Sequence, residues 1–350
     1  MTYTLYQKYL LFRSKMGVII RSIKYKGKVP LTKKIYFMFK GFLAESYLIY
    51  DFQTNDFRYY LSDYERAKSR FINGSSATLL NDKIIFEDAF SPYIYVPKTI
   101  ATIYEGNFLP TFKLPEVSDI DDLINHCSND EKVVFKPYKE SDGGRGVFFL
   151  SVVNGHIYLD SEKVTKKELI QRIEGLNNYI VSEYIYQDEF SSSFYPDTAN
   201  TIRILSMRDP YTKKPFIAYS VYRIGTKKSA PIDAWFAGGV CSKIDISTGE
   251  LGKGVLIDKG KKTYVDYHPD TKAKITGTFI PNWEEVKKKV LSASTNFPDL
   301  KYVAWDIVIG KNDIVALEGN NCSNVNFLQV HEPLLVNKKV NEFYKFHGII

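Results

Sequence analysis

The sequence predicts an α+β protein in which a mainly helical N-terminal region precedes two segments that mix strands and helices. Residues 1–90 contain runs with helical spacing, which Pro30 interrupts. Beyond them, β-rich runs bounded by turn residues recur, as at Thr201–Arg208 and Pro215–Arg223, and helical spacing returns between them. We therefore expect three regions: a basic helical region over 1–90, a small α+β subdomain over 91–185 that forms a lid, and a larger sheet-based α+β subdomain over 186–350.

The composition is that of an ordinary globular chain whose excess positive charge lies at one end. The 350 residues are enough for two or three packed units, with 44% hydrophobic and 25% charged residues. Net charge is +7, yet residues 1–44 contain ten Lys or Arg and no Asp or Glu, so the remainder is nearly neutral. The three Cys are few and widely spaced, which favours a reducing compartment. The five His form no metal or triad pattern, so we expect them to be structural.

The basic N-terminal segment suggests a surface that binds anions. Its longest uncharged run near the start, Met16–Ile20, is too short to span a membrane. We expect a cytoplasmic protein in which residues 1–44 contact an anionic membrane, at the inner face, as a basic amphipathic helix. The alternative is a helix packed on the body of the protein with its lysines in solvent. We expect no nucleic-acid partner.

A β-hairpin is predicted near the C-terminus. Val303–Ile309 and Ile314–Leu317 are β-rich runs, and the polar loop between them is centred on Asn312. With that centre, Asp306 pairs with Glu318 and Ala304 pairs with Asn320.

The paired residues of this hairpin share one face, because side chains of a strand alternate between faces. Two opposed carboxylates repel each other, and a cation between them removes that cost. Oxygen ligands suit Mg²⁺. We therefore predict that Asp306, Glu318 and Asn320 bind a metal; the alternative is a polar face that points to solvent.

A glycine-rich turn is predicted within Val133–Leu150. A strand ends near Lys136, a polar turn containing Gly143, Gly144 and Gly146 follows, and a second strand leaves it. A cation beside exposed backbone N–H groups suits phosphate binding.

The order of these segments over roughly residues 40–335 resembles the ATP-grasp enzymes, and most closely their branch found with sugar-transfer and surface-polysaccharide pathways. The similar motifs are LNDKIIFEDAF at 80–90, KPYKESDGGRGV at 136–147, VSEYI at 181–185, NTIRI at 200–204, the Gly238–Gly239 pair, and WDI with LEGN in the predicted hairpin. The resemblance implies the ATP-grasp fold, in which two α+β subdomains grip ATP, with ATP and Mg²⁺ as cofactors.

The resemblance also implies roles for nucleotide-binding residues. Lys83 and Lys136 match the two ATP-facing lysines. The hinge strand of the family matches residues 181–185, so the backbone around Tyr184 and Ile185 would pair with the adenine edge, and Glu183 would accept a hydrogen bond from the adenine amino group. The acid that holds the ribose is Asp188 or Glu189.

Two arginines take the positions of basic residues near the transferred phosphate or the acid substrate. Arg203 lies in the NTIRI motif and Arg223 in a YRIG segment, and with Lys136 they form the predicted catalytic set. One departure from the branch is Ala234, which follows Asp233 where an Asn is common. Because that segment shapes the acceptor pocket, we expect a different substrate.

The resemblance implies an ADP-forming carboxylate–amine ligase that makes an amide through an acyl-phosphate, acting on small-molecule or glycan substrates in surface-polysaccharide or sugar-conjugate biosynthesis. A kinase of the same fold, acting on a sugar or polyol hydroxyl, stays open as an alternative. A third reading, a nucleotide-binding partner without catalysis, is disfavoured by the intact lysines, glycines and predicted metal ligands.

Overall fold

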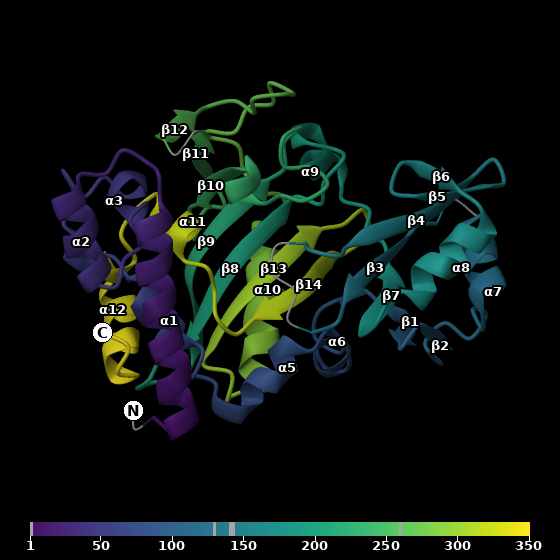
Figure 1. The fold of residues 1–350 in the computed structure, drawn as a ribbon, viewed down its shortest axis with the longest axis horizontal. Coiled ribbons are helices and arrows are strands. Elements are labelled where there is room, and N and C mark those ends of the chain that lie inside the picture. Colours follow the sequence, from purple (N-terminus) through teal and green to yellow (C-terminus); the bar gives the residue numbers. More distant parts are fainter. Residues whose placement is uncertain (1–2, 129–130, 140–143, 259–260) are drawn as a thin grey trace. The chain divides into compact units, whose positions relative to one another are not determined.

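The chain passes more than once between two structural units. The computed structural model describes residues 3–128, 131–139, 144–258 and 261–350 (Figure 1). Unit 1 comprises Met1–Ala77, Asp188–Ile307 and Gly319–Ile350, and unit 2 comprises Thr78–Gln187 and Val308–Glu318. Each is described by itself below, and the three regions expected from the sequence stay a prediction about domain organisation.

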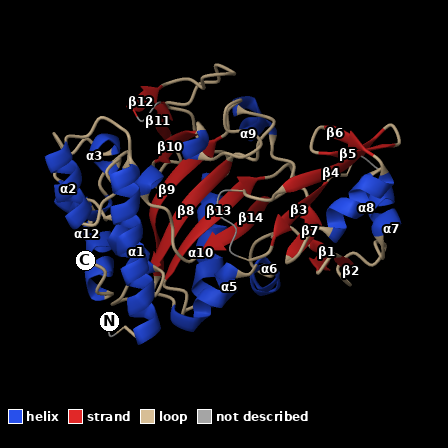
Figure 2. Ribbon diagram, viewed as in Figure 1, coloured by secondary structure: helices blue, strands red, loops and turns tan. Residues whose placement is uncertain are grey.

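Unit 2 is built on a seven-stranded sheet in the order β2-β1-β7-β3-β4-β5-β6. All its described pairings are antiparallel. The strands, red in Figure 2, are β1 (Thr99–Tyr104), β2 (Asn107–Pro110), β3 (Val133–Pro137), β4 (Phe148–Val153), β5 (His156–Leu159), β6 (Glu162–Val164) and β7 (Tyr179–Glu183). The helices are α5 (Thr78–Asn81), α6 (Lys83–Phe90), α7 (Ile120–Cys127) and α8 (Lys166–Glu174).

The core of unit 2 follows from the alternation of its central strands. Phe135 in β3 and Phe148 in β4 stack with ring centroids 4.6 Å apart, and both are buried. Leu123 of α7 and Leu169 of α8 pack into the same cluster, so both helices present apolar side chains to it. Burial on that side leaves the alternate positions, including Lys136, for the other side of the strand.

Unit 1 is built on a second seven-stranded sheet, in the order β12-β11-β10-β9-β8-β13-β14. Its strands are β8 (Thr201–Arg208), β9 (Pro215–Ile224), β10 (Val240–Ile244), β11 (Leu251–Asp258), β12 (Lys261–Val265), β13 (Tyr302–Ile309) and β14 (Ile314–Asn320). The tip of the β13–β14 hairpin, Val308–Glu318, belongs to unit 2. Every residue of β8 and of β13 is buried, which makes these central strands the interior of the unit.

The helices of unit 1 are α1 (Leu5–Lys24), α2 (Leu31–Phe39), α3 (Ser46–Ile49), α4 (Asp63–Ser69), α9 (Glu189–Phe194), α10 (Trp283–Asn296), α11 (Asn326–Gln329) and α12 (Lys338–Phe346), and the short 3-10 turns are η1 (Phe57–Tyr59), η2 (Gly74–Ala77), η3 (Trp235–Ala237) and η4 (Leu334–Val336). They include α1 to α4 of the predicted helical N-terminal region, whereas α5 and α6 of that region lie in unit 2. Pro30 separates α1 from α2, as expected. No helix of the described residues is both long and apolar enough to cross a membrane.

Candidate active site

Unit 2 gathers two lysines and a glutamate that the sequence predicts for ATP and metal binding. Lys83 is the first residue of α6, where Asp82 caps the helix by accepting from the N–H groups of Ile84 and Ile85. The Lys83 Nζ lies 3.6 Å from Glu318 Oε2. Burial lowers the pKa of Lys136 to about 8; the positive charge of Lys83 adds to that fall, and the Glu318 carboxylate opposes it.

The half-buried position of Lys136 is costly to the free protein. A desolvated ammonium beside a second ammonium is stabilised by anions, and a polyphosphate supplies several negative charges. The electrostatics of this lysine cluster therefore favour an anionic ligand.

The glycine-rich turn is described in part. Gly143 lies outside the described residues. Gly144 and Gly146 have φ angles of 72° and 76°, and a Cβ at Gly146 would lie 2.3 Å from the Tyr179 hydroxyl oxygen. The turn therefore needs glycine at position 146 for both its conformation and its close packing.

The hinge after β7 is held in place by backbone hydrogen bonds. The N–H of Tyr184 donates to the carbonyl of Lys132 at 3.2 Å, and Ile185 follows it outside the strand. The Glu183 carboxylate accepts from the Tyr95 hydroxyl at 2.7 Å and from the N–H of Lys98 at 3.0 Å. Its position is therefore fixed from two sides.

The two candidate ribose acids, both in unit 1, have different surroundings. Asp188 caps α9, accepting from the N–H of Ser191 at 2.8 Å. Glu189 is exposed at the first position of that helix. Because capping already engages Asp188, Glu189 is the acid more readily offered to a ligand.

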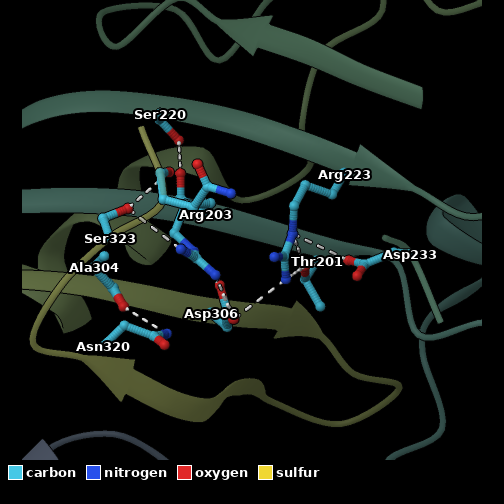
Figure 3. A network of polar contacts seen from close by, with 10 residues as sticks. Thr201, Arg203, Ser220, Arg223, Asp233, Ala304, Asp306, Asn320 and Ser323 are labelled. Carbon is cyan, nitrogen blue, oxygen red and sulfur yellow. Dashed lines mark hydrogen bonds and ion pairs between the residues drawn. The ribbon is translucent and has the colours of Figure 1, made fainter. Parts of the chain in front are cut away.

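Unit 1 contains a buried network of two arginines and two aspartates (Figure 3). Arg203 in β8 lies opposite Asp306 in β13, and its Nε and Nη2 donate to both carboxylate oxygens, the second bond being 2.9 Å. Arg223 of β9 places its Nη2 3.2 Å from Asp306 Oδ2. The two guanidinium groups therefore share one carboxylate.

A second aspartate completes this network. Arg223 Nε lies 3.3 Å from Asp233 Oδ2, and the Thr201 hydroxyl donates to the same oxygen. Burial raises the pKa of Asp233, while the Arg223 charge and the Thr201 hydrogen bond oppose that rise. Both guanidinium groups also lie over the Phe327 ring, at 5.2 and 5.7 Å from its centroid.

Sequence reasoning singled out both arginines but not their partnership with Asp306. It also gave no role to the Ser323 hydroxyl, which accepts from Arg203 Nη1 at 3.3 Å. An arginine between Ile202 and Ile204 in a buried strand needs a carboxylate partner. This requirement is the sequence feature that could have indicated the partnership of Arg203 with an aspartate.

The predicted metal ligands lie on the two strands of one hairpin. The Asn320 amide donates to the Ala304 carbonyl at 3.2 Å, which joins two residues that the sequence pairs. The donors are hard oxygens, as Mg²⁺ requires, although Asp306 is held by arginines and Glu318 by Lys83. Among the described residues, no group of three or more His, Cys, Asp or Glu side chains is placed to hold a metal ion. The predicted set contains one Asp, one Glu and one Asn, so only two of its side chains are of these four types.

These two antiparallel sheets with flanking helices, preceded by a helical region, have the ATP-grasp fold. The model of the sugar-transfer associated ATP-grasp family matches residues 63–343, and the chain belongs to that family. The predicted fold class and family are therefore confirmed. A comparison with curated proteins finds no match.

Several solved structures are similar at low sequence identity. The ATP-grasp ligase PsnB, complexed with minimal precursor, Mg and ADP, is 12% identical, with a TM-score of 0.37 and coverage of 78% of this chain and 62% of that one. The macrocyclase MdnC from Microcystis aeruginosa MRC, bound with precursor peptide MdnA, is 12% identical, with a TM-score of 0.38 and coverage of 81% and 61%. The ADP complex of PurK, N5-carboxyaminoimidazole ribonucleotide synthetase, is 11% identical, with a TM-score of 0.39 and coverage of 73% and 48%. This chain spans less than two thirds of the length of each.

Proposed function

We propose that the chain is an ATP-dependent carboxylate–amine ligase that forms an amide through an acyl-phosphate, in surface-polysaccharide or sugar-conjugate biosynthesis. The observation that carries this proposal is the pair of buried guanidinium groups, Arg203 and Arg223, around one carboxylate in a member of this family. Guanidinium groups bind carboxylate and phosphate through two parallel hydrogen bonds, which suits a substrate acid and the phosphate that it receives.

The lysine cluster would hold the nucleotide phosphates. Lys83 and Lys136 provide the positive charge, and the turn at Gly144 and Gly146 brings backbone close to the ligand. The hinge at Glu183 would bind adenine and Glu189 the ribose. Asp306, Glu318 and Asn320 would hold Mg²⁺, which when bound neutralises charge that develops on the transferred phosphoryl group.

The proposed reaction needs no protein nucleophile. The substrate carboxylate attacks the γ-phosphorus of ATP, the bond to the bridging oxygen breaks, and ADP leaves. An amine then attacks the acyl carbon, phosphate leaves, and the amine proton is released. Arg203 and Arg223 would orient the carboxylate and stabilise the phosphoryl oxygens, while the glycine-rich turn excludes water from the acyl-phosphate.

The stoichiometry of products tests this reaction. A ligase releases ADP and phosphate together, and only when acid and amine are both present. Uronic acids and amino acids are screened with Mg-ATP while ADP, AMP and phosphate are measured separately, and hydroxylamine traps an acyl-phosphate as a hydroxamate. We expect ADP, phosphate and a hydroxamate from the correct acid. ADP without phosphate, on a substrate that lacks a carboxylate, would replace the ligase with a sugar or polyol kinase.

We also propose that residues 1–44 bind an anionic membrane surface. Helix α1 buries Leu11 and Val18 against its own unit, yet it exposes an apolar stripe on its opposite face: Leu5, Tyr9, Phe12, Met16, Ile20 and Ile23. Their spacing of four, three, four, four and three residues keeps them on one side of the helix. Ten cations and no acids in this segment suit anionic lipid, each contributing roughly 1 kcal/mol near such a surface.

Vesicle co-sedimentation tests the membrane proposal. Binding should rise with the fraction of anionic lipid and fall with salt, because the attraction is partly electrostatic. Phe12→Ser with Ile20→Ser should weaken it, whereas Thr54→Ser on an exposed turn should not. Equal binding to neutral vesicles, or none to either kind, would support the packed-helix alternative.

A further inference from the structure

A polar cavity of about 210 Å³ lies within unit 1, apart from the arginine–aspartate network. Helix α1 contributes Arg21, α4 contributes Arg66, and the loop before α3 contributes Glu45. Phe236 of η3 and Asn326 of α11 line the remaining wall. The cavity is therefore built from helical N-terminal residues together with two segments close to the proposed catalytic residues.

Two polar side chains of this cavity lack partners in the part of the chain that the structure describes. Asn326 is 5% exposed, and no described residue hydrogen bonds to its side-chain amide. The Glu45 carboxylate has neither a hydrogen bond nor an ion pair with a described residue, and burial raises its pKa. The Asn326 amide and the half-buried Glu45 carboxylate are therefore available to hydrogen bond with a ligand in the cavity.

Other groups in the cavity belong to the fold. Asp63 is buried and accepts from the N–H of Leu43 at 2.9 Å and from the Ser46 hydroxyl at 3.4 Å. Asp63 therefore shapes the wall, while Glu45 and Asn326 remain for the ligand.

One short segment joins this cavity to the arginine network. Ser323 accepts from Arg203 and donates to the carbonyl of Asn324, whose side chain lines the cavity. Phe327, one residue after Asn326, lies beneath both arginines. A molecule in the cavity would therefore contact the segment that positions Arg203.

We infer that this cavity binds a monosaccharide unit of the substrate, an inference that rests on the proposed function. Two arginines and two carboxylates line it, so their formal charges balance and a singly charged ion gains no net attraction. A ring with several hydroxyl groups both donates and accepts, which matches carboxylate, amide and guanidinium groups together. The Phe236 ring, 50% exposed, offers an apolar surface to the C–H face of a sugar.

The size of the cavity agrees with a single sugar ring. Pockets for drug-sized ligands have volumes of roughly 300–1,000 Å³, and 210 Å³ is below that range. The family that the chain belongs to is described as sugar-transfer associated, which is compatible with a sugar ligand.

Saturation-transfer NMR on the full chain tests the inference. The probes are glucose, galactose and mannose with their 2-amino and uronic acid forms, each with and without Mg-ATP. We expect saturation transfer to the ring protons of at least one sugar. Glu45→Gln and Phe236→Ala should each weaken its affinity about three- to tenfold, whereas Glu285→Gln on the exposed face of α10 should not.

The outcomes separate this inference from the proposed ligase. Stabilisation by Mg-ATP in a thermal melt reports nucleotide binding independently of the sugar. No transfer to any sugar, or an affinity unchanged in both variants, would overturn the cavity assignment while leaving a nucleotide-binding enzyme in place. Loss of both the sugar signal and the Mg-ATP shift in wild type would count against both proposals.

Discussion

Replacing Asp306 and replacing Glu318 should affect the fold very differently, although we propose that both ligate Mg²⁺. Asp306 is 4% exposed and pairs with the guanidinium groups of Arg203 and Arg223, whose side chains are 7% and 13% exposed. The Glu318 side chain is 31% exposed and lies 3.6 Å from one lysine. Their substitution therefore separates a structural role from a ligand role.

The magnitudes follow from burial. Asp306→Asn leaves Arg203 without a carboxylate partner among the described residues and removes one of the two aspartates paired with Arg223. Breaking a buried pair in this way costs about 3–5 kcal/mol, because a buried charge remains uncompensated. Glu318→Gln removes a partly exposed pair, which costs about 0–1 kcal/mol.

Urea unfolding measures both effects. The three tryptophans, Trp235, Trp283 and Trp305, all lie in unit 1, so their fluorescence reports the unit that contains Asp306. Far-UV circular dichroism follows the whole chain and includes unit 2. A loss below 1 kcal/mol for Asp306→Asn, or equal losses for the two variants, would refute the assigned difference in burial and pairing.

Two further predictions concern the lysine cluster. Because the pKa of Lys136 falls from its usual 10.5 to about 8 in the folded state, Lys136→Met should raise the free energy of unfolding at pH 7, by at most about 3 kcal/mol. That gain in stability should shrink between pH 8 and 10.5, because folded wild type loses the Lys136 proton there and with it the destabilisation. Urea titrations at three pH values measure this. A variant less stable than wild type at pH 7 would contradict the assignment. Glu318→Gln should abolish turnover, measured as ADP release, while its affinity for ATP, measured by calorimetry, falls less than tenfold. If this variant turned over at the wild-type rate at limiting Mg²⁺, Glu318 would not be a metal ligand.

Local patterns predicted the strands better than the ends of helices. Thr201–Arg208 is a strand with the expected bounds, and the expected run Pro215–Arg223 is a strand that continues to Ile224, because β-rich runs there are bounded by turn residues. Asn81 and Asp82 are both residue types that favour a helix N-cap, but Asp82 is the cap of α6, and Asn81 ends the preceding α5. Adjacent short polar side chains can each accept from a helix N–H, so sequence alone chooses poorly between them.

Two other helix starts show the same difficulty. Ser118 and Asp119 are both residue types that favour an N-cap, yet Asp119 accepts from the N–H groups of Asp121 and Asp122, and Ser118 instead donates to the Asp122 carboxylate. Proline favours the first turn of a helix, but a 3-10 turn follows Pro333 and α12 begins after Asn337. The Asn337 side chain satisfies two N–H groups, which makes it the stronger start signal.

The arginine network could not be derived from local pattern because it depends on the register between distant strands. Arg203 and Asp306 face each other only when β8 pairs with β13. Arg223 lies opposite Thr201 through the separate pairing of β9 with β8. A shift of one residue in either pairing would turn the side chains to the other face. The sequence supplies the charged groups, and long-range strand pairing supplies their contacts.

The carboxylates that we propose as metal ligands form ion pairs with the cations that we propose as phosphate ligands. We therefore expect the binding of Mg²⁺ and the binding of ATP to be coupled. Arg203 and Arg223 hold Asp306, and Lys83 holds Glu318, so Mg²⁺ alone must compete with these cations for the carboxylates. Under the proposed function, ATP would supply phosphate partners for the cations and would thereby make the carboxylates available to the metal. Because such coupling is reciprocal, Mg²⁺ should tighten ATP binding by the same factor by which ATP tightens Mg²⁺ binding. Calorimetric titration of each ligand with and without the other measures the two factors; affinity for Mg²⁺ that is unchanged by ATP would show that the carboxylates and cations do not exchange partners.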